Sequence, residues 1–243
     1  MTDLLAIAEA PAAHIVPRHP RVIVGDGYVV SQMGPRDGAV QAIRLAPDRL
    51  EAARTEVRAL ARERDWESFS WWVSDLTEPS DLGERLGLES EESLTALALT
   101  APPAADGAVD VRRVETAGQF ATAQRIDLVA QGLEPDGDDE SYARSWEGLR
   151  EMFLLWLAYD GDRPVGMGRA ARSESALMLI GGATLPDARG RGVYRSVVAA
   201  RWQAAVELGT PALVVSANDE SEPILRRLGF EELGSIRLFV DRL

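Results

Sequence analysis

The chain has 243 residues, with 26 basic residues against 39 acidic ones, two His and no Cys, and every basic residue is an Arg. Without Cys there is no thiol nucleophile or zinc–thiolate site, and without Lys there is neither Schiff-base chemistry nor a Walker A loop. The formal net charge of −13 argues against binding to nucleic acid and favours cationic small substrates. Because the two histidines, His14 and His19, lie near the N-terminus, chemistry in the C-terminal half must depend on carboxylates, hydroxyls, backbone amides, Arg or a cofactor.

The sequence has no apolar run of the ~18–20 residues that a membrane span needs. Its N-terminal stretch carries Asp3 and Glu9, whereas a secretory signal peptide begins with cations. We therefore expect a cytoplasmic protein with no membrane and no nucleic-acid partner. The exclusive use of Arg and the many Ala residues are typical of a GC-rich genome, which we expect to be bacterial.

Strands and helices alternate on both sides of a stretch rich in Pro, Ala and Gly at residues 101–108. Before it, the patterns predict, in chain order, strands near 21–24, 27–33 and 40–45, a helix over 48–64 with Asp48 as its N-cap, a strand at 69–74, a short helix ending at Leu86 and a strand at 94–99. After it, they predict a strand at 109–114, helices over 116–130 and 139–150, an antiparallel meander of strands at 153–158, 164–171 and 176–185, a helix over 190–208, a strand at 212–216, a short helix to Leu228 and a strand at 234–240. These elements predict an α/β chain of the α+β type, with mixed, mostly antiparallel sheets flanked by helices, in two domains at 1–104 and 105–243.

The two halves repeat one another. Residues 49–93 align without a gap with residues 191–235, so that Gly87 falls on Gly229 at an offset of 142 residues. Helix falls on helix, and the corner Arg85-Leu86-Gly87-Leu88 falls on Arg227-Leu228-Gly229-Phe230. A shared corner within a shared order of elements predicts a tandem duplication.

The second copy opens its long helix with a turn that the first copy lacks. Gly190 and Gly192 let the backbone approach a ligand closely, and Arg189, Arg191 and Arg195 add three cations. Because a helix N-terminus has unpaired N–H groups and the positive end of the helix dipole, this turn is a candidate phosphate site. The alternative is a solvent-facing turn with surface arginines. At the offset of 142, the first copy carries Leu50, Glu51 and Ala52 in place of Gly192, Val193 and Tyr194.

Arg189-Gly190-Arg191-Gly192-Val193-Tyr194 resembles the Arg/Gln-x-x-Gly-x-Gly/Ala acyl-CoA signature of the GNAT (Gcn5-related N-acetyltransferase) superfamily. Downstream, Asn218-Asp-Glu-Ser221 followed by Leu225-Arg-Arg-Leu-Gly-Phe230 is similar to the family's Asn-x-x-Ala…Tyr-x-x-Leu-Gly-Phe segment at the family's spacing. The resemblance covers about residues 109–243. The first half looks like a degenerate copy of the same fold, so the resemblance implies a tandem arrangement of GNAT-like acyl-CoA N-acyltransferase folds.

The resemblance implies that backbone amides in the turn hold the pyrophosphate of acetyl-CoA, a co-substrate, and that the strand before the turn pairs with the pantetheine arm. The implied cofactor-binding residues are Thr184, Leu185, Arg189, Gly190, Arg191, Gly192, Val193, Tyr194 and Asn218. The candidate catalytic residues are Asn218 and Glu220, with a helix-start carboxylate as the alternative to a general base for Glu220, and no metal is implied. Two positions depart from the family pattern: Tyr194 stands where the family prefers Gly or Ala, and Leu225 stands where many members have the Tyr that protonates the departing CoA thiolate.

The implied function is an acetyl-CoA-dependent N-acetyltransferase that transfers an acetyl group to a primary amine of a small molecule or peptide. The amine would attack the thioester directly in a ternary complex, without an acyl-enzyme. The alternative is a non-catalytic acyl-CoA-binding or regulatory module, which Leu225 favours. A homodimer is compatible with the sequence. The five carboxylates of residues 133–140 either form a solvated loop or attract the amine.

Overall fold

The computed structural model describes residues 2–19, 21–104, 108–135 and 137–243. The chain folds into two compact units. The first unit extends to Ala98 and includes Ser216–Leu225 and Glu231–Leu243, and the second comprises Leu99–Val215 and Arg226–Phe230. The domain border predicted at residue 104 divides the two sequence copies, and it stays a prediction. The compact units are a different division of the chain, because they place the C-terminal strand with the first half. Residues 105–107 of the predicted linker and Asp136 of the acidic stretch lie outside the described residues.

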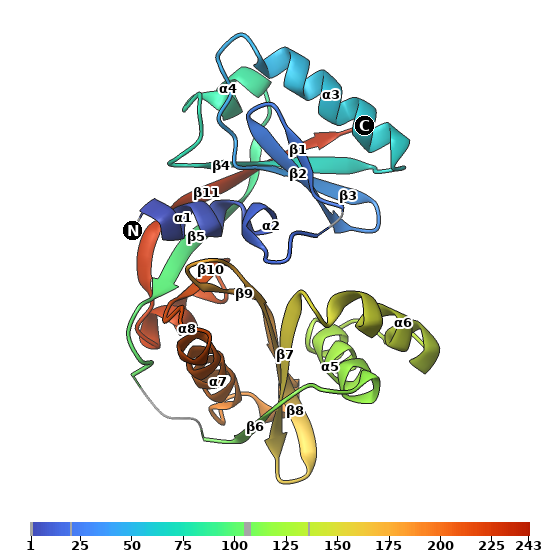
Figure 1. Ribbon diagram of the computed structural model, residues 1–243, viewed down its shortest axis with the longest axis vertical. Helices are drawn as coiled ribbons and strands as arrows, with labels where there is room; N and C mark the ends of the chain where they lie inside the picture. Colours follow the sequence, from blue (N-terminus) through green and yellow to red (C-terminus); the bar gives the residue numbers. More distant parts are fainter. Residues whose placement is uncertain (1, 20, 105–107, 136) are drawn as a thin grey trace. The chain divides into compact units, whose positions relative to one another are not determined.

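The first unit contains five helices, in whole or in part, and six strands among its described residues (Figure 1). They are α1 (Thr2–Glu9), α2 (Pro11–His14), β1 (Ile23–Gly25), β2 (Tyr28–Gly34), β3 (Asp37–Gln41), α3 (Leu50–Glu63), β4 (Ser68–Ser74), α4 (Leu82–Leu86), β5 (Ser90–Leu99), α8 (Glu222–Arg227, shared with the second unit) and β11 (Glu231–Arg242). The strands lie in the order β1-β2-β3-β4-β11-β5. Among the strand pairs that the described residues of this unit form, only β3–β4 is parallel.

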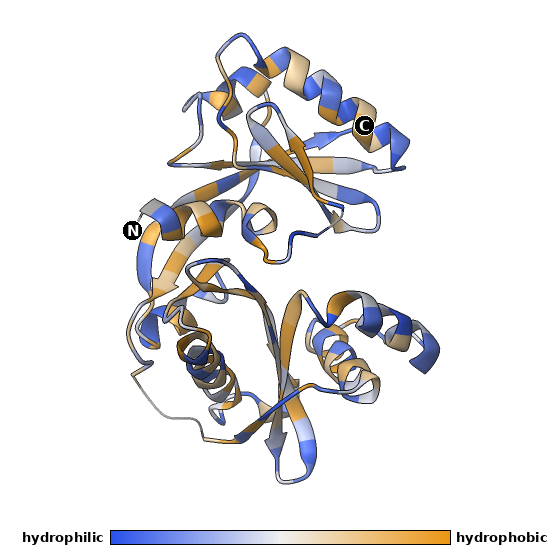
Figure 2. Cartoon of the chain, in the orientation of Figure 1, coloured by the Kyte–Doolittle hydropathy of each residue, from blue (hydrophilic) through white to orange (hydrophobic). Residues whose placement is uncertain are grey.

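The core of the first unit forms between the strands and α3. Hydrophobic and hydrophilic residues alternate around α3 (Figure 2), and its Leu50, Ala53, Val57 and Ala61 are buried. They pack with the aromatic side chains of β4, among them Trp71, in one hydrophobic cluster. This burial of large apolar side chains is the main favourable term in the stability of the unit.

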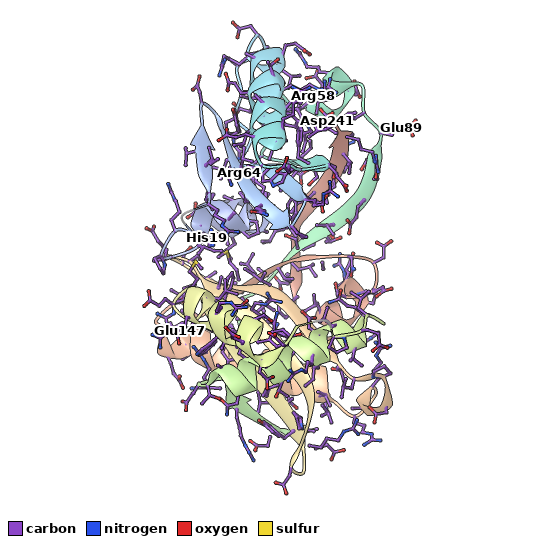
Figure 3. All side chains as sticks on the ribbon, turned by 90° about the vertical axis from the view of Figure 1, so that its right-hand side faces the viewer. His19, Arg58, Arg64, Glu89, Glu147 and Asp241 are labelled. Atoms are coloured by element: carbon purple, nitrogen blue, oxygen red, sulfur yellow. The ribbon has the colours of Figure 1, made fainter. Side chains whose placement is uncertain are left out.

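β11 joins this core through a buried charge. Asp241 is 1 % exposed and accepts hydrogen bonds from Nε of Arg54 at 2.8 Å and from Nη2 of Arg58 at 2.6 Å. Figure 3 shows Asp241 at the end of β11 beside Arg58 of α3. The C-terminal strand is therefore held between β4 and β5 by its ladders and to α3 by these ion pairs.

The second unit contains a four-stranded antiparallel run followed by one parallel strand. Its elements are β6 (Asp110–Arg113), α5 (Ala117–Ala130), α6 (Asp139–Leu149), β7 (Phe153–Asp160), β8 (Arg163–Arg172), β9 (Leu177–Thr184), a 3-10 turn (Pro186–Ala188), α7 (Val193–Glu207) and β10 (Leu213–Ala217). The strand order is β10-β9-β8-β7-β6, and among the described residues of this unit only β10 and β9 are parallel. The helices α5 and α6 cover one face of this sheet and α7 covers the other (Figure 1).

The predicted fold class and the meander are confirmed. The mixed, mostly antiparallel sheets with flanking helices match the α+β prediction, and α5 and α6 begin and end within one residue of their predicted bounds. The helices α1 and α2 were not predicted, because segments of eight and four residues are too short for a helical repeat to be distinguished. The N-cap prediction for Asp48 is wrong: α3 begins at Leu50, after Arg49, with no side-chain cap.

The last strands of the two copies pair in a symmetric register. Leu94 of β5 lies opposite Ile236 of β11, and these two residues are 142 positions apart. The ladder is irregular at two places, where Leu233 and Glu91 have no partner, and these too are 142 positions apart. An exchange of the two copies at this offset therefore maps the β5–β11 ladder onto itself, as expected for a duplication.

Across the long helices the gap-free alignment is wrong by two residues. The buried residues Ala53, Val57 and Ala61 of α3 correspond to the buried Val197, Arg201 and Ala205 of α7, which is an offset of 144. Both helices are followed by left-handed residues at the same offset, Asp65 with φ 54° and Gly209 with φ 76°. The counterparts of Gly192, Val193 and Tyr194 in the first copy are therefore Asp48, Arg49 and Leu50 rather than Leu50, Glu51 and Ala52.

Candidate functional site

The turn between β9 and α7 has the backbone that its glycines predict. Gly190 and Gly192 have φ values of +78° and +80°, a left-handed conformation that other residues rarely adopt. These two residues delay the start of α7 to Val193, three residues after the predicted start at 190. Among the described residues, no side chain caps α7. The N–H groups of its first turn are therefore open to an anion.

The strand that leads into this turn exposes its backbone. Within the part of the chain that the structure describes, β9 pairs with β10 at two positions only, Leu177 with Leu213 and Met178 with Val214. Farther along, β9 pairs with β8 alone, and Gly181 and Gly182 are exposed in a strand that is otherwise largely buried. One edge of β9 is therefore available to a ligand over residues 179–184.

The arginines of the turn have different partners. Nη2 of Arg189 donates to the carbonyl oxygen of Ala130 at 3.0 Å, and its Nε lies 3.5 Å from the carbonyl oxygen of Thr184. Arg191 is exposed and pairs with Asp160 at 2.9 Å. Arg189 therefore connects the C-terminal end of α5 to the end of β9, a structural contact that the sequence did not predict.

Tyr194 points away from the turn. Its ring lies against Gly182, where an added Cβ would be 2.9 Å from Cε2, and its hydroxyl is within hydrogen-bonding reach of Arg201. Burial raises the pKa of Tyr194, and the charge and hydrogen bond of Arg201 oppose this shift. Tyr194 replaces the small residue of the family signature, but its ring does not cover the N-terminus of α7.

Arg201 was missed in the sequence. Its guanidinium is fully buried, with 0 % exposure, and its Nη2 donates to the carbonyl oxygen of Gly181 at 2.7 Å. Burial lowers its pKa to about 10. The signal was present: Arg201 stands four residues after Val197 and eight after Val193, on the apolar stripe of α7.

Asn218 and Glu220 lie in the first unit, at the start of α8. Oδ1 of Asn218 accepts from the N–H of Ser221 at 3.0 Å and from its hydroxyl at 2.8 Å, so Asn218 caps the turn into α8. Residues 218–220 line a cavity of about 450 Å³ with residues 90–93. The turn at 189–194 belongs to the second unit, so the predicted assembly of both groups into one site stays a prediction.

The remaining sequence candidates have local roles. Leu225 is 0 % exposed and packs in the interior, where it has no proton to donate. In the acidic stretch, Asp138 caps α6 through the N–H of Ser141 at 2.8 Å, and Asp139 and Glu140 form exposed ion pairs with Arg125 and Arg144. No three His, Cys, Asp or Glu side chains among the described residues form a metal-binding group. None of the helices drawn from those residues combines the length and apolar character needed to cross a bilayer.

The first copy closes the region that is open in the second. There, β3 and β4 pair at four positions, Asp37 to Val40 opposite Ser68 to Trp71. Farther along, Glu78 donates its N–H to the carbonyl oxygen of Ile43 at 3.0 Å and accepts from the N–H of Leu45 at 2.8 Å. Arg44 reaches the buried Glu9, which also accepts from the hydroxyl of Ser74. The backbone edge corresponding to that of residues 179–184 is thus occupied by the chain itself.

Comparisons with known proteins support the resemblance. Residues 131–239 match the family model described as an acetyltransferase (GNAT) domain. No curated protein sequence matches the chain. Among solved structures, a GCN5-related N-acetyltransferase from Kribbella flavida is similar over 98 % of this chain and 94 % of that one, with 18 % identity and a TM-score of 0.73.

A tandem GNAT protein from the clavulanic acid biosynthesis pathway is similar over 98 % of this chain and 93 % of its own, with 15 % identity and a TM-score of 0.65. A GCN5-related N-acetyltransferase from Sphaerobacter thermophilus matches 89 % of this chain and 76 % of its own, with 12 % identity and a TM-score of 0.61. At these identities the likeness is one of fold. Residues 131–239 match a GNAT domain, and the chain has the fold of a tandem GNAT protein.

Proposed function

We propose that the chain is an acetyl-CoA-dependent N-acetyltransferase whose second copy binds the CoA. The observation that supports this most directly is the pairing of an exposed strand edge at residues 179–184 with an uncapped helix N-terminus behind two left-handed glycines. The helix N-terminus supplies N–H donors and partial positive charge for a pyrophosphate. The free edge of β9 supplies the backbone groups that an amide-bearing pantetheine arm can pair with.

The reaction needs little from the side chains. A thioester carbonyl is already activated, so the protein supplies orientation and a backbone N–H that stabilises the developing oxyanion. The amine nitrogen attacks the carbonyl carbon, the carbon–sulfur bond breaks, and CoA departs as a thiolate. The proton of the ammonium passes to Glu220 or to water, and the thiolate takes a proton from solvent. Because a thiol has a pKa of about 8.5, the thiolate leaves without the acid that Leu225 replaces.

An amine acceptor agrees with the charge of the chain. The cavity beside residues 218–220 is lined by four carboxylates, Glu91, Glu92, Asp219 and Glu220. Of these, Glu91 pairs with Arg242. The others leave a negative surface that favours an ammonium over an anion. We propose a primary amine of a small molecule or peptide as the acceptor on this ground and on the family resemblance.

The test combines binding with turnover. Calorimetric titration of the full chain with acetyl-CoA should show saturable binding, and a thiol-release assay over a panel of small amines and short peptides should identify acceptors. Binding without release on any amine would instead support the non-catalytic acyl-CoA-binding module. Absence of acetyl-CoA binding would overturn both.

A further inference from the structure

Arg201 lies where a charged side chain is least expected. It projects from α7 beneath β8 and β9, and two glycines make room for it: a Cβ on Gly168 or Gly182 would lie 2.1 Å or 2.7 Å from its Nη2. In the described chain the guanidinium donates to the carbonyl oxygen of Gly181 and has the Tyr194 hydroxyl within reach, and its Nε has no hydrogen-bond partner. Besides Tyr194, the ionisable side chain that shifts the pKa of Arg201 is Arg169, which is also a cation. Burial of an ion without a counter-charge is costly, so the fold alone does not favour Arg at this position.

The first copy shows that the fold does not need it. With the helices aligned by their buried faces, Val57 is the counterpart of Arg201 and Leu50 is the counterpart of Tyr194. Both are buried in the hydrophobic cluster of the first unit. The copy with a closed strand edge therefore uses two apolar residues where the copy with an open edge uses a polar pair.

The hydrogen bond of Arg201 acts on the irregular part of β9. Gly168 lies opposite Gly182 and Ala170 opposite Leu179, so β9 has one extra residue in this interval. Gly181 within the bulge has φ +118°. Because a trans peptide is planar with C=O and N–H antiparallel, a carbonyl drawn to Arg201 also fixes the direction of the Gly182 N–H, away from α7.

We propose that Arg201, supported by Tyr194, is a positioning residue for the acyl-transfer reaction: it sets the peptide plane between Gly181 and Gly182, and through it the exposed backbone groups that contact the thioester end of acetyl-CoA. This inference rests on the proposed function. It separates two tasks within the second copy: the turn at residues 190–194 binds the pyrophosphate, and the bulge held by Arg201 orients the reacting end.

The test uses Arg201→Met, which keeps the bulk but removes the charge, Arg201→Lys, which keeps a donor, and Tyr194→Phe, which removes only the hydroxyl. Gln203→Met, an exposed position on the same helix, is the matched control. Without ligand, amide hydrogen exchange over residues 179–184 should be about tenfold faster in Arg201→Met than in the parent. Arg201→Lys should restore part of the protection, and Gln203→Met should match the parent.

With acetyl-CoA and an accepted amine, Arg201→Met should leave the Kd for CoA unchanged and lower kcat by about 10²-fold, the scale of a misplacement near 1 Å. A purely structural role would lower the thermal midpoint and raise Kd and KM together. Parent-like exchange at residues 179–184 in Arg201→Met, or in Tyr194→Phe if Arg201→Met does not fold, would overturn the inference. Failure of the proposed function is distinguishable, since it appears in the parent as absence of CoA binding or release, whereas the exchange measurement needs neither.

Discussion

At the scale of single residues, Gly192 has a left-handed backbone conformation and stands immediately before α7. Replacement by Val should raise the Kd for CoA about tenfold or more, because a β-branched residue resists the left-handed conformation and its Cβ would lie 2.9 Å from Nη2 of Arg195 and 3.1 Å from Cβ of Ala108, so that the turn must shift. Gly209→Val is the control for the left-handed backbone alone, since Gly209 has φ +76° and, among the described residues, no heavy atom lies within 4 Å of its Cβ position. Calorimetry measures Kd, and circular dichroism checks that both variants fold. Equal CoA affinity in the two variants would remove Gly192 from the site.

Arg189 has both a structural contact and a proposed ligand contact. Arg189→Ala should weaken CoA binding by about 1–3 kcal/mol, the scale of a charge-assisted hydrogen bond. It should also lower the thermal midpoint, because the side chain no longer connects Ala130 at the end of α5 to Thr184 at the end of β9. Arg163→Ala is the control, since Arg163 forms an exposed pair with Asp187 nearby. If the two variants bind CoA equally well, the pyrophosphate does not contact Arg189.

At the scale of elements, Asp241 connects the last strand to α3. Burial would raise the pKa of its carboxyl, but the hydrogen bonds from Arg58 and Arg54 outweigh burial and hold it below the usual 3.8. A carboxyl with a lowered folded-state pKa stabilises the protein above pH 3.8, and this contribution is lost as the pH falls through that value and below it. Asp241→Asn should therefore lower the free energy of unfolding at pH 7 by about 1–3 kcal/mol and flatten its decline between pH 5 and pH 3.

Urea unfolding of parent and variant at several pH values measures both effects. The control is Asp81→Asn, because Asp81 forms an exposed pair with Arg85 within one helical turn and should contribute little. Parallel pH curves for the parent and Asp241→Asn would show that the ion pairs of Asp241 do not stabilise the fold.

Local signals explain which elements the sequence predicts well. Thr116 and Gln119 form a capping box, and α5 begins at the next residue after Thr116, as expected. The apolar runs of β7, β8 and β9, separated by short turns, likewise predict the meander within a few residues. The insertion of β11 between β4 and β5 was out of reach, because no local pattern specifies a partner strand about 140 residues away. Arg201 was overlooked for a similar reason: a charge on an apolar stripe conflicts with the periodicity that defines the helix.

At the scale of the whole molecule, the two copies differ in one strand edge, which is open to a ligand in the second copy and closed by the chain itself in the first. The symmetric β5–β11 register and the left-handed residues Asp65 and Gly209 show a common plan. The copies differ where β9 exposes residues 179–184 and where Glu78 bonds to Ile43 and Leu45. Because β11 pairs with β4 and β5, a C-terminal fragment would lack both partners of its last strand. Tests of the function therefore require the full chain.

The closed copy leads to the last prediction, that one chain binds one CoA. Asp48 occupies the position of Gly192 in the first copy, and a carboxylate there repels a pyrophosphate. Removal of that charge should still not create a second site, since the bonds of Glu78 and the contact of Arg44 with the buried Glu9 keep the edge of β3 occupied. Calorimetric titration of the parent and of Asp48→Gly should both saturate at one CoA per chain, while Gly192→Val should weaken that single site. A second site in Asp48→Gly would show that charge alone and not the closed strand edge keeps CoA from the first copy, and two equivalent sites in the parent would show that neither excludes it.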